Sequence, residues 1–179
     1  MNIHLVLPSS VHRPCVTDFV TQQYAKRMSV IPPLPDILFA AIDEGKCIGT
    51  IGLEFSDTDG NPIPCEHIFA FNPSQLQMPV PRTASAQYSR WTVTDPNVAR
   101  KIAYTATTYA IAQGKECGWC ELKPQVARRM QLLGIVLHEV KGASIQLDRV
   151  DDSVRQYYCS KPYPKLYQID LAQTVKALQ

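Results

Sequence analysis

Two cysteines with a spacing typical of thiol chemistry stand in the segment E-C-G-W-C-E, residues 116–121. Cys117 and Cys120 form a C-x-x-C pair, a spacing used for thiol–disulfide exchange in some proteins and for zinc binding in others. In thioredoxin-like proteins the pair lies where a strand passes into a helix, because the helix N-terminus stabilises the first thiolate. The chemistry open to Cys117 and Cys120 therefore depends on the element that carries them.

The neighbouring residues place this pair inside a strand. Gly114 ends a helix as a left-handed cap would, and residues 116–122 form the next predicted strand. Side chains alternate faces along a strand, so residues three apart point in opposite directions, with Cα atoms about 10 Å apart. A disulfide needs Cα atoms within about 7 Å, and one zinc ion needs both sulfurs at about 2.3 Å. We expect ordinary thiols and no metal site; a thiol oxidoreductase or zinc protein is an alternative that rests on this pair alone.

Composition and charge narrow the class of protein. The chain has 179 residues, of which 45% are hydrophobic and 19% charged, as expected for one domain, residues 1–179, with a sizeable core. Lys and Arg total 18 against 16 acidic residues, a net charge of +2, which is too balanced for a dedicated nucleic-acid binder. Neither a signal-peptide core nor a membrane span is recognisable. We therefore expect a cytoplasmic protein whose six cysteines are reduced.

The order of predicted elements indicates an α/β fold with a mixed central sheet flanked by helices. Helical spacing, prolines at helix starts and closing glycines predict helices at about 14–29, 98–113, 124–133 and 151–159. Short apolar runs predict strands at 3–7, 37–43, 47–55, 67–71, 87–94, 116–122, 135–140 and 166–171, the second and third forming a hairpin. A long loop from Pro73 to Pro81 is of the kind that borders binding sites. Gly49 and Gly52 mark a bulge or a close backbone approach.

One segment of this pattern resembles a known superfamily. A-Q-Y-S-R-W-T-V-T-D, residues 86–95, with the helix and strand that follow, is similar to the G-N-acyltransferase (GNAT) fold. Within it the chain looks like the branch of acyl-homoserine-lactone synthases, N-acyl amino acid synthases and thermostable hemolysins. That branch carries a related strand, which is matched by Ser89, Arg90, Trp91 and Val93. The first helix, the hairpin and V-R-Q-Y-Y-C-S-K-P at 154–162 are similar too, so the likeness in element order covers nearly the whole chain.

The resemblance implies an N-acyltransferase. Its acyl donor would be a pantetheine thioester, acyl-CoA or acyl-carrier protein, and its acceptor a small amine such as an amino acid, which attacks directly without a covalent enzyme intermediate or a tightly bound cofactor. In the superfamily the strands corresponding to 87–94 and 116–122 splay apart and bind the pantetheine arm, and the next helix N-terminus receives the pyrophosphate. The donor-binding residues implied here are Trp91, Thr92, Val93, Asn97, Arg100 and Lys101.

Two departures from the family pattern bear on the substrates. D-P-N-V-A-R-K, residues 95–101, lacks the glycine loop of acetyl-CoA-dependent members. This departure argues against plain acetyl-CoA and is compatible with an acyl-carrier protein or a long-chain acyl donor. Gln87 stands where homoserine-lactone synthases have a glutamate, and an amide cannot act as a base at neutral pH. A homoserine-lactone product is therefore not expected. An acyl-ligand or metabolite-binding protein on the same fold, without turnover, is the alternative to an enzyme.

Acyl transfer to an amine needs a group that removes an amine proton and a group that protonates the leaving thiolate. Glu54 is our first candidate base, because it ends an apolar strand next to the long loop; Glu66 and His67 follow. Tyr157 or Tyr158 is the candidate acid, because members of the superfamily often use a tyrosine from this region. The structural alternatives are a strand-end charge for Glu54 and packing at the core edge for the two tyrosines.

Strand periodicity assigns the remaining candidates. It predicts Gln87, Ser89, Trp91 and Val93 on one face, and Tyr88, Arg90 and Thr92 on the other. On this prediction Gln87 and Ser89 hydrogen-bond the acceptor, and Arg90 holds its carboxylate. The alternatives are a structural ion pair for Arg90 and a solvated helix face for Arg100 and Lys101.

Overall fold

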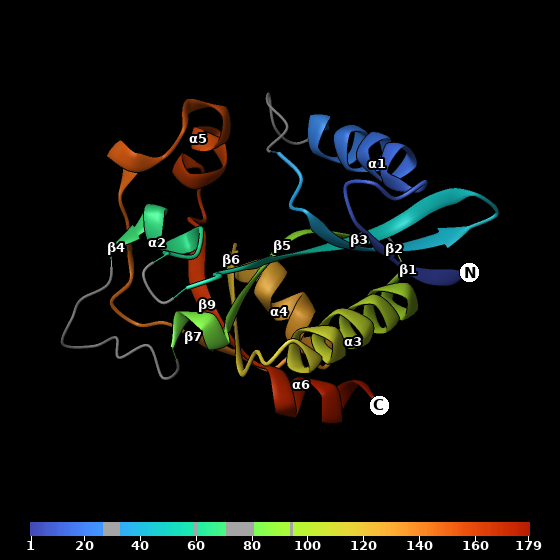
Figure 1. The fold of residues 1–179 in the computed structure, drawn as a ribbon. Coiled ribbons are helices and arrows are strands. Elements are labelled where there is room, and N and C mark those ends of the chain that lie inside the picture. Colours follow the sequence, from blue (N-terminus) through green and yellow to red (C-terminus); the bar gives the residue numbers. More distant parts are fainter. Residues whose placement is uncertain (27–32, 59–60, 71–80, 94) are drawn as a thin grey trace.

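Figure 1 shows a twisted sheet with helices on both faces. The computed structural model describes residues 1–26, 33–58, 61–70, 81–93 and 95–179. In these residues seven strands form the main sheet, in the order β1-β2-β3-β5-β6-β9-β7, and β4 pairs with β8. The strands are β1 Asn2–Val6, β2 Ile37–Asp43, β3 Lys46–Phe55, β4 Phe69–Ala70, β5 Ser85–Val93, β6 Cys117–Leu122, β7 Leu137–Glu139, β8 Ser144–Ile145 and β9 Lys165–Asp170.

The helices divide between the two faces of the sheet. One face is covered by α3 Pro96–Ala112, α4 Pro124–Leu132 and α6 Leu171–Leu178. The other carries α1 Arg13–Ala25 over β1 and β2, and α2 Cys65–Ile68 with α5 Asp152–Cys159 over β6 and β9. The 3-10 turns η1 Arg82–Ala84 and η2 Leu147–Arg149 complete the described elements. None of the described helices is long and apolar enough to cross a membrane.

Three apolar clusters follow from this arrangement. The largest lies under α3, α4 and α6 and includes Ile51, Leu53 and Tyr88. On the opposite face one cluster joins α1 to β1 and β2, and another joins α2 and α5 to β6 and β9. The middle of that face, over β3, β5 and the end of β6, lies between these two clusters. It is where polar side chains of the sheet gather.

A bulge in β5 changes which of its residues share a face. Gly52 pairs with Ser89 and Thr50 with Thr92, so two β5 residues, Arg90 and Trp91, oppose one residue of β3. Arg90 has a φ of 51°, and its carbonyl accepts a hydrogen bond from Thr50 Oγ1 at 2.9 Å. The predicted alternation is therefore wrong beyond Arg90, because the bulge inserts one residue. Thr92 joins the face of Ser89, whereas Trp91 and Val93 pack against the large core cluster.

The strands β5 and β6 pair over only part of their length. Within the described residues, their parallel register comprises Ser85 with Cys117, Ala86 with Gly118 and Gln87 with Trp119. Beyond Gln87, β5 continues to pair with β3, and β6 continues to pair with β9, but not with each other. We call the diverging segments 88–93 and 120–122 the β5/β6 split; Figure 1 shows the two strands separating. The predicted splaying of these two strands is confirmed.

Most predicted elements are present, with ends shifted by a few residues. The hairpin, the strand before α3 and the strand–helix unit β6–α4 match the prediction. The predicted strand at 67–71 is wrong in its first half, because α2 occupies Cys65–Ile68; Phe69–Ala70 is strand, and residue 71 lies outside the described residues. The helix α6 was not predicted. The last turn of the first predicted helix and nearly all of the loop from Pro73 to Pro81 lie outside the described residues.

Candidate active site

The sheet face that carries α1, α2 and α5 receives a carboxylate from β6, Glu121. Among the described residues, Glu121 is the one carboxylate that β6 contributes to the middle of this face, beside the β5/β6 split. It lies on β6 opposite Leu166 of β9, two residues beyond Trp119 and on the same face. Tyr158 of α5 donates a hydrogen bond to Glu121 Oε2. Burial raises the pKa of Glu121 to about 7, and the charge of Glu54 adds to the rise, whereas Tyr158, Arg90 and Gln87 oppose it. Such a carboxyl group can gain or lose a proton at neutral pH.

Gln87 lies beside this carboxyl group on the neighbouring strand. Its side chain is buried, and its Oε1 accepts a hydrogen bond from the main-chain N–H of Cys65 at 2.6 Å. This bond ties the start of α2 to β5. Its amide also lies near enough to Glu121 to lower that residue's pKa. Gln87 therefore orients its amide between α2 and Glu121.

Three buried polar atoms on this face have no hydrogen-bond partner among the described residues: Ser89 Oγ, Trp119 Nε1 and Glu121 Oε1. Buried polar groups are usually paired, because burial without a hydrogen bond costs about 1–3 kcal/mol each. Ser89 follows Gln87 by two residues on β5, and Glu121 follows Trp119 by two on β6. Because Gln87 pairs with Trp119, the three atoms come from one block of adjacent same-face positions. Together they form a polar floor with unused donors and acceptors.

The helix α5 closes one side of this floor. Besides the Tyr158 contact, the Tyr157 hydroxyl donates to the main-chain oxygen of Glu121 at 3.4 Å. Lys123 Nζ donates to Ser160 Oγ at 2.6 Å and lies over the Tyr157 ring, 5.2 Å from its centroid. These contacts fix the end of α5 against the end of β6. Both candidate tyrosines are thus brought to Glu121.

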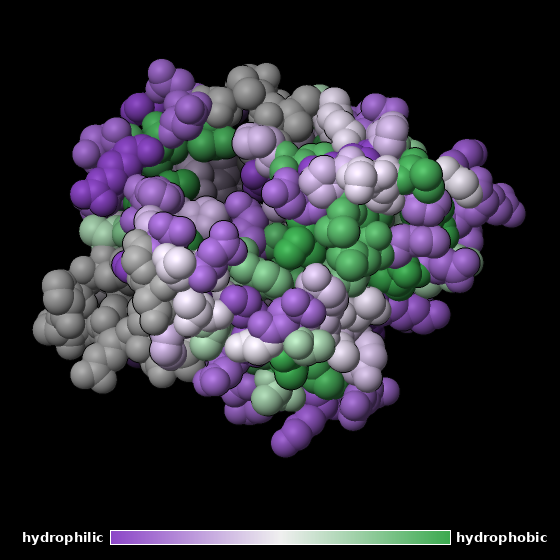
Figure 2. Space-filling model, viewed as in Figure 1, coloured by the Kyte–Doolittle hydropathy of each residue, from purple (hydrophilic) through white to green (hydrophobic). Residues whose placement is uncertain are grey.

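The segment leading into β2 closes the opposite side. Arg90 Nε and Nη2 both donate to the Pro33 carbonyl, at 3.1 and 2.7 Å. Pro35 lies directly over Gly52, where an added Cβ would stand 2.5 Å from the proline Cγ and 3.0 Å from Ser89 Oγ. The predicted close backbone approach at Gly52 is therefore confirmed. Figure 2 shows the surface hollowed between α5 and this segment.

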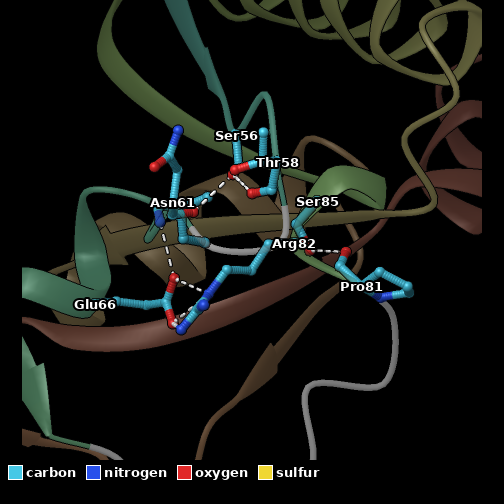
Figure 3. Close-up of polar contacts among 8 residues, drawn as sticks. Ser56, Thr58, Asn61, Glu66, Pro81, Arg82 and Ser85 are labelled. Atoms are coloured by element: carbon cyan, nitrogen blue, oxygen red, sulfur yellow. Dashed lines mark hydrogen bonds and ion pairs between the residues drawn. The ribbon is translucent and has the colours of Figure 1, made fainter.

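The bases predicted from sequence have different surroundings. Glu54 pairs across the sheet with Gln87, is half-buried, and lies near enough to Glu121 to raise its pKa. Glu66 is held in an ion pair: Arg82 Nη2 donates to Oε1 at 2.8 Å, and Arg82 Nε donates to both oxygens at 3.0 Å (Figure 3). Its Oε2 also accepts from the Ile63 N–H at 2.8 Å. Glu66 therefore joins α2 to η1, and His67 is exposed on α2.

The two cysteines of the C-x-x-C pair point to opposite faces, as predicted. Cys117 belongs to the cluster under α5, and Cys120 to the cluster under α3. Both thiols are free, and burial raises the pKa of each, that of Cys117 to about 11. Buried thiols with raised pKa are poor nucleophiles. No group of three metal-binding side chains occurs in the described part of the chain.

The residues predicted to bind the donor are placed around the N-terminus of α3. Asp95 caps this helix: its Oδ1 accepts from Asn97 N at 2.7 Å and from Val98 N at 3.2 Å. Arg100 donates to the carbonyls of Leu133 and Ala177, at 2.7 and 3.2 Å, near the C-terminal ends of α4 and α6. These two bonds use two of the five N–H donors of the guanidinium group and hold it against the ends of α4 and α6.

The other residues predicted to contact the acyl donor lie in a surface groove or in β5. Lys101 is exposed and lines, with Asn97 and Arg100, a surface groove of about 570 Å³ between α3, β1 and the end of α6. Trp91 and Val93 are partly buried against the core, and Thr92 is buried beside Thr50. The contact of these strand residues with a pantetheine arm stays a prediction, made through their main chain.

Two residues of the site were missed from the sequence. Glu121 and Trp119 both stand in the strand that was expected to carry two ordinary thiols and to border the pantetheine arm, and neither was named as a site residue. Their signal was available, because a glutamate within the run C-G-W-C-E-L, residues 117–122, is an unusual residue for a buried strand. The hydrogen bond to the Glu121 carboxyl group comes from Tyr158 of α5, 37 residues later in the chain.

Comparisons with known proteins support the fold. No family model and no curated protein sequence matches the chain. Among solved structures, the acyl-homoserine-lactone synthase TofI has a TM-score of 0.66 at 16% identity and covers 99% of this chain and 96% of its own. MesI, a CoA-dependent acyl-homoserine lactone synthase, has a TM-score of 0.60 at 14% identity, with 99% and 93% covered. FeeM, an N-acyl amino acid synthase from uncultured soil microbes, has 0.57 at 12%, with 99% of each chain covered.

At these identities the likeness is one of fold. It confirms the predicted α/β fold of GNAT-type acyltransferases, with a mixed sheet flanked by helices. The solved structures that share this fold include synthases that transfer acyl groups.

Proposed function

We propose that this protein is an N-acyltransferase that moves an acyl group from a pantetheine thioester to a small amine. The observation that carries the proposal is the β5/β6 split, which leaves main-chain groups of two adjacent strands unpaired with each other next to the polar floor. An extended pantetheine arm contains two amide groups that can pair with such strand edges. Its thioester would then lie over the floor formed by Ser89, Trp119 and Glu121.

The known proteins of this fold support acyl transfer as the reaction class. MesI is CoA-dependent, and FeeM makes N-acyl amino acids. By analogy we propose acyl-CoA or an acyl-carrier protein as donor and an amino acid as acceptor, inside the cytoplasm. The whole chain, residues 1–179, would act as a single acyltransferase domain.

The test is a search for product with a graded set of donors. Acyl-CoAs of increasing chain length and acylated carrier protein are each mixed with a panel of amino acids, and both released thiol and N-acyl product are measured, the latter by mass spectrometry. We expect thiol release that depends on the amine, above the hydrolysis seen without it. The absence of any N-acyl product across the panel would refute the proposal.

A non-catalytic acyl-ligand-binding protein is the second candidate. The amide of Gln87 favours it, because an amide cannot act as a base at neutral pH. Thermal stabilisation by an acyl thioester, without thiol release, would distinguish this function from catalysis.

A further inference from the structure

The reaction proposed above needs a proton acceptor close to the β5/β6 split. The amine must lose a proton to become a nucleophile, and a positioned side chain normally takes it. Gln87 is the last β5 residue that pairs with β6, and its amide cannot do so. The base must therefore come from another element.

The neighbouring strand supplies one at the corresponding place. Trp119 is the pairing partner of Gln87, and Glu121 follows it by two residues on the same face, just beyond the last pair. The Gln87 and Glu121 side chains therefore stand on the same face of two adjacent strands, at neighbouring same-face positions. Position 87 of β5 is a glutamine in this chain. Glu121 of β6 thus places a carboxyl group in the region that a glutamate at position 87 would occupy.

The two oxygens of Glu121 differ in their partners. Oε2 is held by the Tyr158 hydroxyl, so the orientation of the carboxyl group is fixed by α5. Oε1 is buried and has no hydrogen-bond partner among the described residues. One oxygen is therefore anchored, and the other is a buried acceptor that no described residue uses. Ser89 Oγ and Trp119 Nε1 are unpaired on the same floor.

We propose that Glu121 is the catalytic residue that accepts a proton from the acceptor's ammonium group, taking from β6 the role that a carboxylate at position 87 would have. The inference rests on the acyltransferase function proposed above. Tyr158 is a positioning residue, which acts through Glu121. The acyl-acceptor substrate that fits this arrangement has a primary ammonium group, whose N–H would donate to Glu121 Oε1.

The proposed step balances as follows. Glu121 takes one proton from the ammonium group, and the resulting amine nitrogen forms a bond to the thioester carbon. As this intermediate collapses, the carbon–sulfur bond breaks, and the second proton lost by nitrogen passes to the pantetheine sulfur. The products are an amide and a thiol, and Glu121 returns its proton to solvent.

The ionisation of Glu121 follows from the groups that face it. Burial raises its pKa to about 7, so a fraction of the protein carries the reactive carboxylate at neutral pH. Among the described residues, the titratable and charged groups near it are Glu54 of β3, Arg90 of β5, Cys120 of β6, Cys65 of α2, and Tyr157 and Tyr158 of α5. Glu54 and Arg90 act in opposite directions on this pKa.

The experiment compares kcat, KM and pH profiles of the full-length protein and four variants. Glu121→Gln removes the base with little change of shape, and Glu54→Gln tests the competing carboxylate. Glu139→Gln is the matched control, because Glu139 is an exposed carboxylate paired with Lys165 on the far side of β9. The double variant Gln87→Glu with Glu121→Gln moves the carboxylate to the neighbouring strand. Circular dichroism and thermal melting establish that each variant folds.

For the wild type we expect kcat/KM to rise with pH around 7. Glu121→Gln should lower kcat by about 100-fold or more with little change in KM, and should abolish this rise. The double variant should recover about tenfold over Glu121→Gln. Glu139→Gln should match the wild type. The double variant also covers the case in which Glu121→Gln alone folds poorly, because it restores the number of carboxylates in the site.

Each other outcome has one meaning. If the wild type is active and Glu121→Gln keeps its kcat and pH profile, the assignment of Glu121 is wrong while the acyltransferase function stands. If Glu54→Gln alone abolishes activity, Glu54 is the base. If the wild type forms no N-acyl product with any donor, the acyltransferase function is wrong, and the role of Glu121 is wrong with it.

Discussion

The buried carboxyl group of Glu121 connects catalysis with stability. Its pKa in the folded protein is about 7, against 4.5 for an ordinary glutamate. Between these two pH values the folded chain holds a proton that the unfolded chain has lost, so the free energy of unfolding falls as pH rises. The protein therefore gives up stability to keep an ionisable group next to the β5/β6 split.

The variant Glu121→Gln isolates this effect without any assay of turnover. Well below pH 4.5 this position is neutral in both chains, folded and unfolded, and their stabilities should differ by a constant. Between pH 4 and 8 the wild type should lose as much as about 3 kcal/mol relative to the variant, since one pKa unit corresponds to about 1.4 kcal/mol. Urea unfolding at intervals of one pH unit measures it. Parallel stability curves for the two chains would show that Glu121 has an ordinary pKa.

The hydroxyl of Tyr158 tunes the same group. Its hydrogen bond to Oε2 lowers the pKa of Glu121 and opposes the effect of burial. Tyr158→Phe should therefore raise this pKa and move the midpoint of the kcat/KM profile upward by about one pH unit, because a hydrogen bond to a charged group contributes about 1.5–3 kcal/mol. Activity at pH 7 should fall accordingly.

Tyr157→Phe is the matched control for this prediction. The Tyr157 hydroxyl donates to the main-chain oxygen of Glu121 and not to its carboxyl group. Its loss should leave the midpoint nearly unchanged. Equal shifts in the two variants would mean that α5 as a whole, and not the Tyr158 hydroxyl, sets the ionisation of Glu121.

Among the elements, the hairpin and the strand–helix units could be predicted because their signals are local. The turn E-G-K fixes β2 and β3, and the proline after a capping residue fixes α3. The helix α6 also had a local signal that was missed: Asp170 caps it by accepting from Gln173 N at 2.8 Å, and Leu171 and Leu178 face the core. Strand Leu166–Leu171 was extended through this cap instead.

The bulge in β5 had no such signal. A positive φ is unusual for arginine, and nothing in the sequence S-R-W marks it. The conformation is held from outside, by Thr50 at the Arg90 carbonyl and by the Pro33 carbonyl at its guanidinium group. Because these contacts come from β3 and from the segment before β2, strand periodicity alone assigned the wrong face to Trp91, Thr92 and Val93.

The packing of Pro35 on Gly52 joins that segment to the site, and it can be tested as an element. Gly52→Ala would place a Cβ 2.5 Å from the Pro35 Cγ, which should cost about 1–3 kcal/mol of stability as an overpacked contact. Pro35→Ala removes the opposing ring atom. In the double variant the cost of Gly52→Ala should be smaller by at least about 0.5 kcal/mol, measured by urea unfolding. Simple additivity would show that the segment moves away freely.

At the scale of the whole molecule, the site is a product of pairing between distant segments. Ser89, Trp119 and Glu121 share one floor only because β5 and β6 pair in parallel up to Gln87 and Trp119. The sequence predicts both strands, and the resemblance predicts that they splay. The residue at which pairing stops depends on the register, and so does the choice of the carboxylate beside Gln87. The candidate bases predicted from the sequence, Glu54, Glu66 and His67, therefore did not include Glu121.

The N-terminus of α3 is the place where the fold would bind the pyrophosphate of the acyl donor. Pro96 has no N–H, Asn97 N and Val98 N donate to Asp95 Oδ1, and Ala99 N donates to the Asp95 carbonyl at 2.9 Å. The first N–H groups of the helix are thus used within the chain, and a carboxylate already occupies the positive end of its dipole. A pyrophosphate would meet an occupied site there. We expect the pantetheine arm to contribute most of the donor's affinity.

This expectation can be measured by comparing acyl-CoA with the matching acyl-pantetheine, by calorimetry at low salt. In the wild type the two should bind with similar affinity. Asp95→Ser keeps a capping hydroxyl but removes the charge, so it should strengthen acyl-CoA binding relative to acyl-pantetheine by about twofold to fivefold, equivalent to 0.3–1 kcal/mol. Asp170→Ser, the same change at the cap of α6, should leave the ratio unchanged. A wild-type preference for acyl-CoA of about 100-fold, or nearly 3 kcal/mol, would mean that the nucleotide binds elsewhere or displaces Asp95.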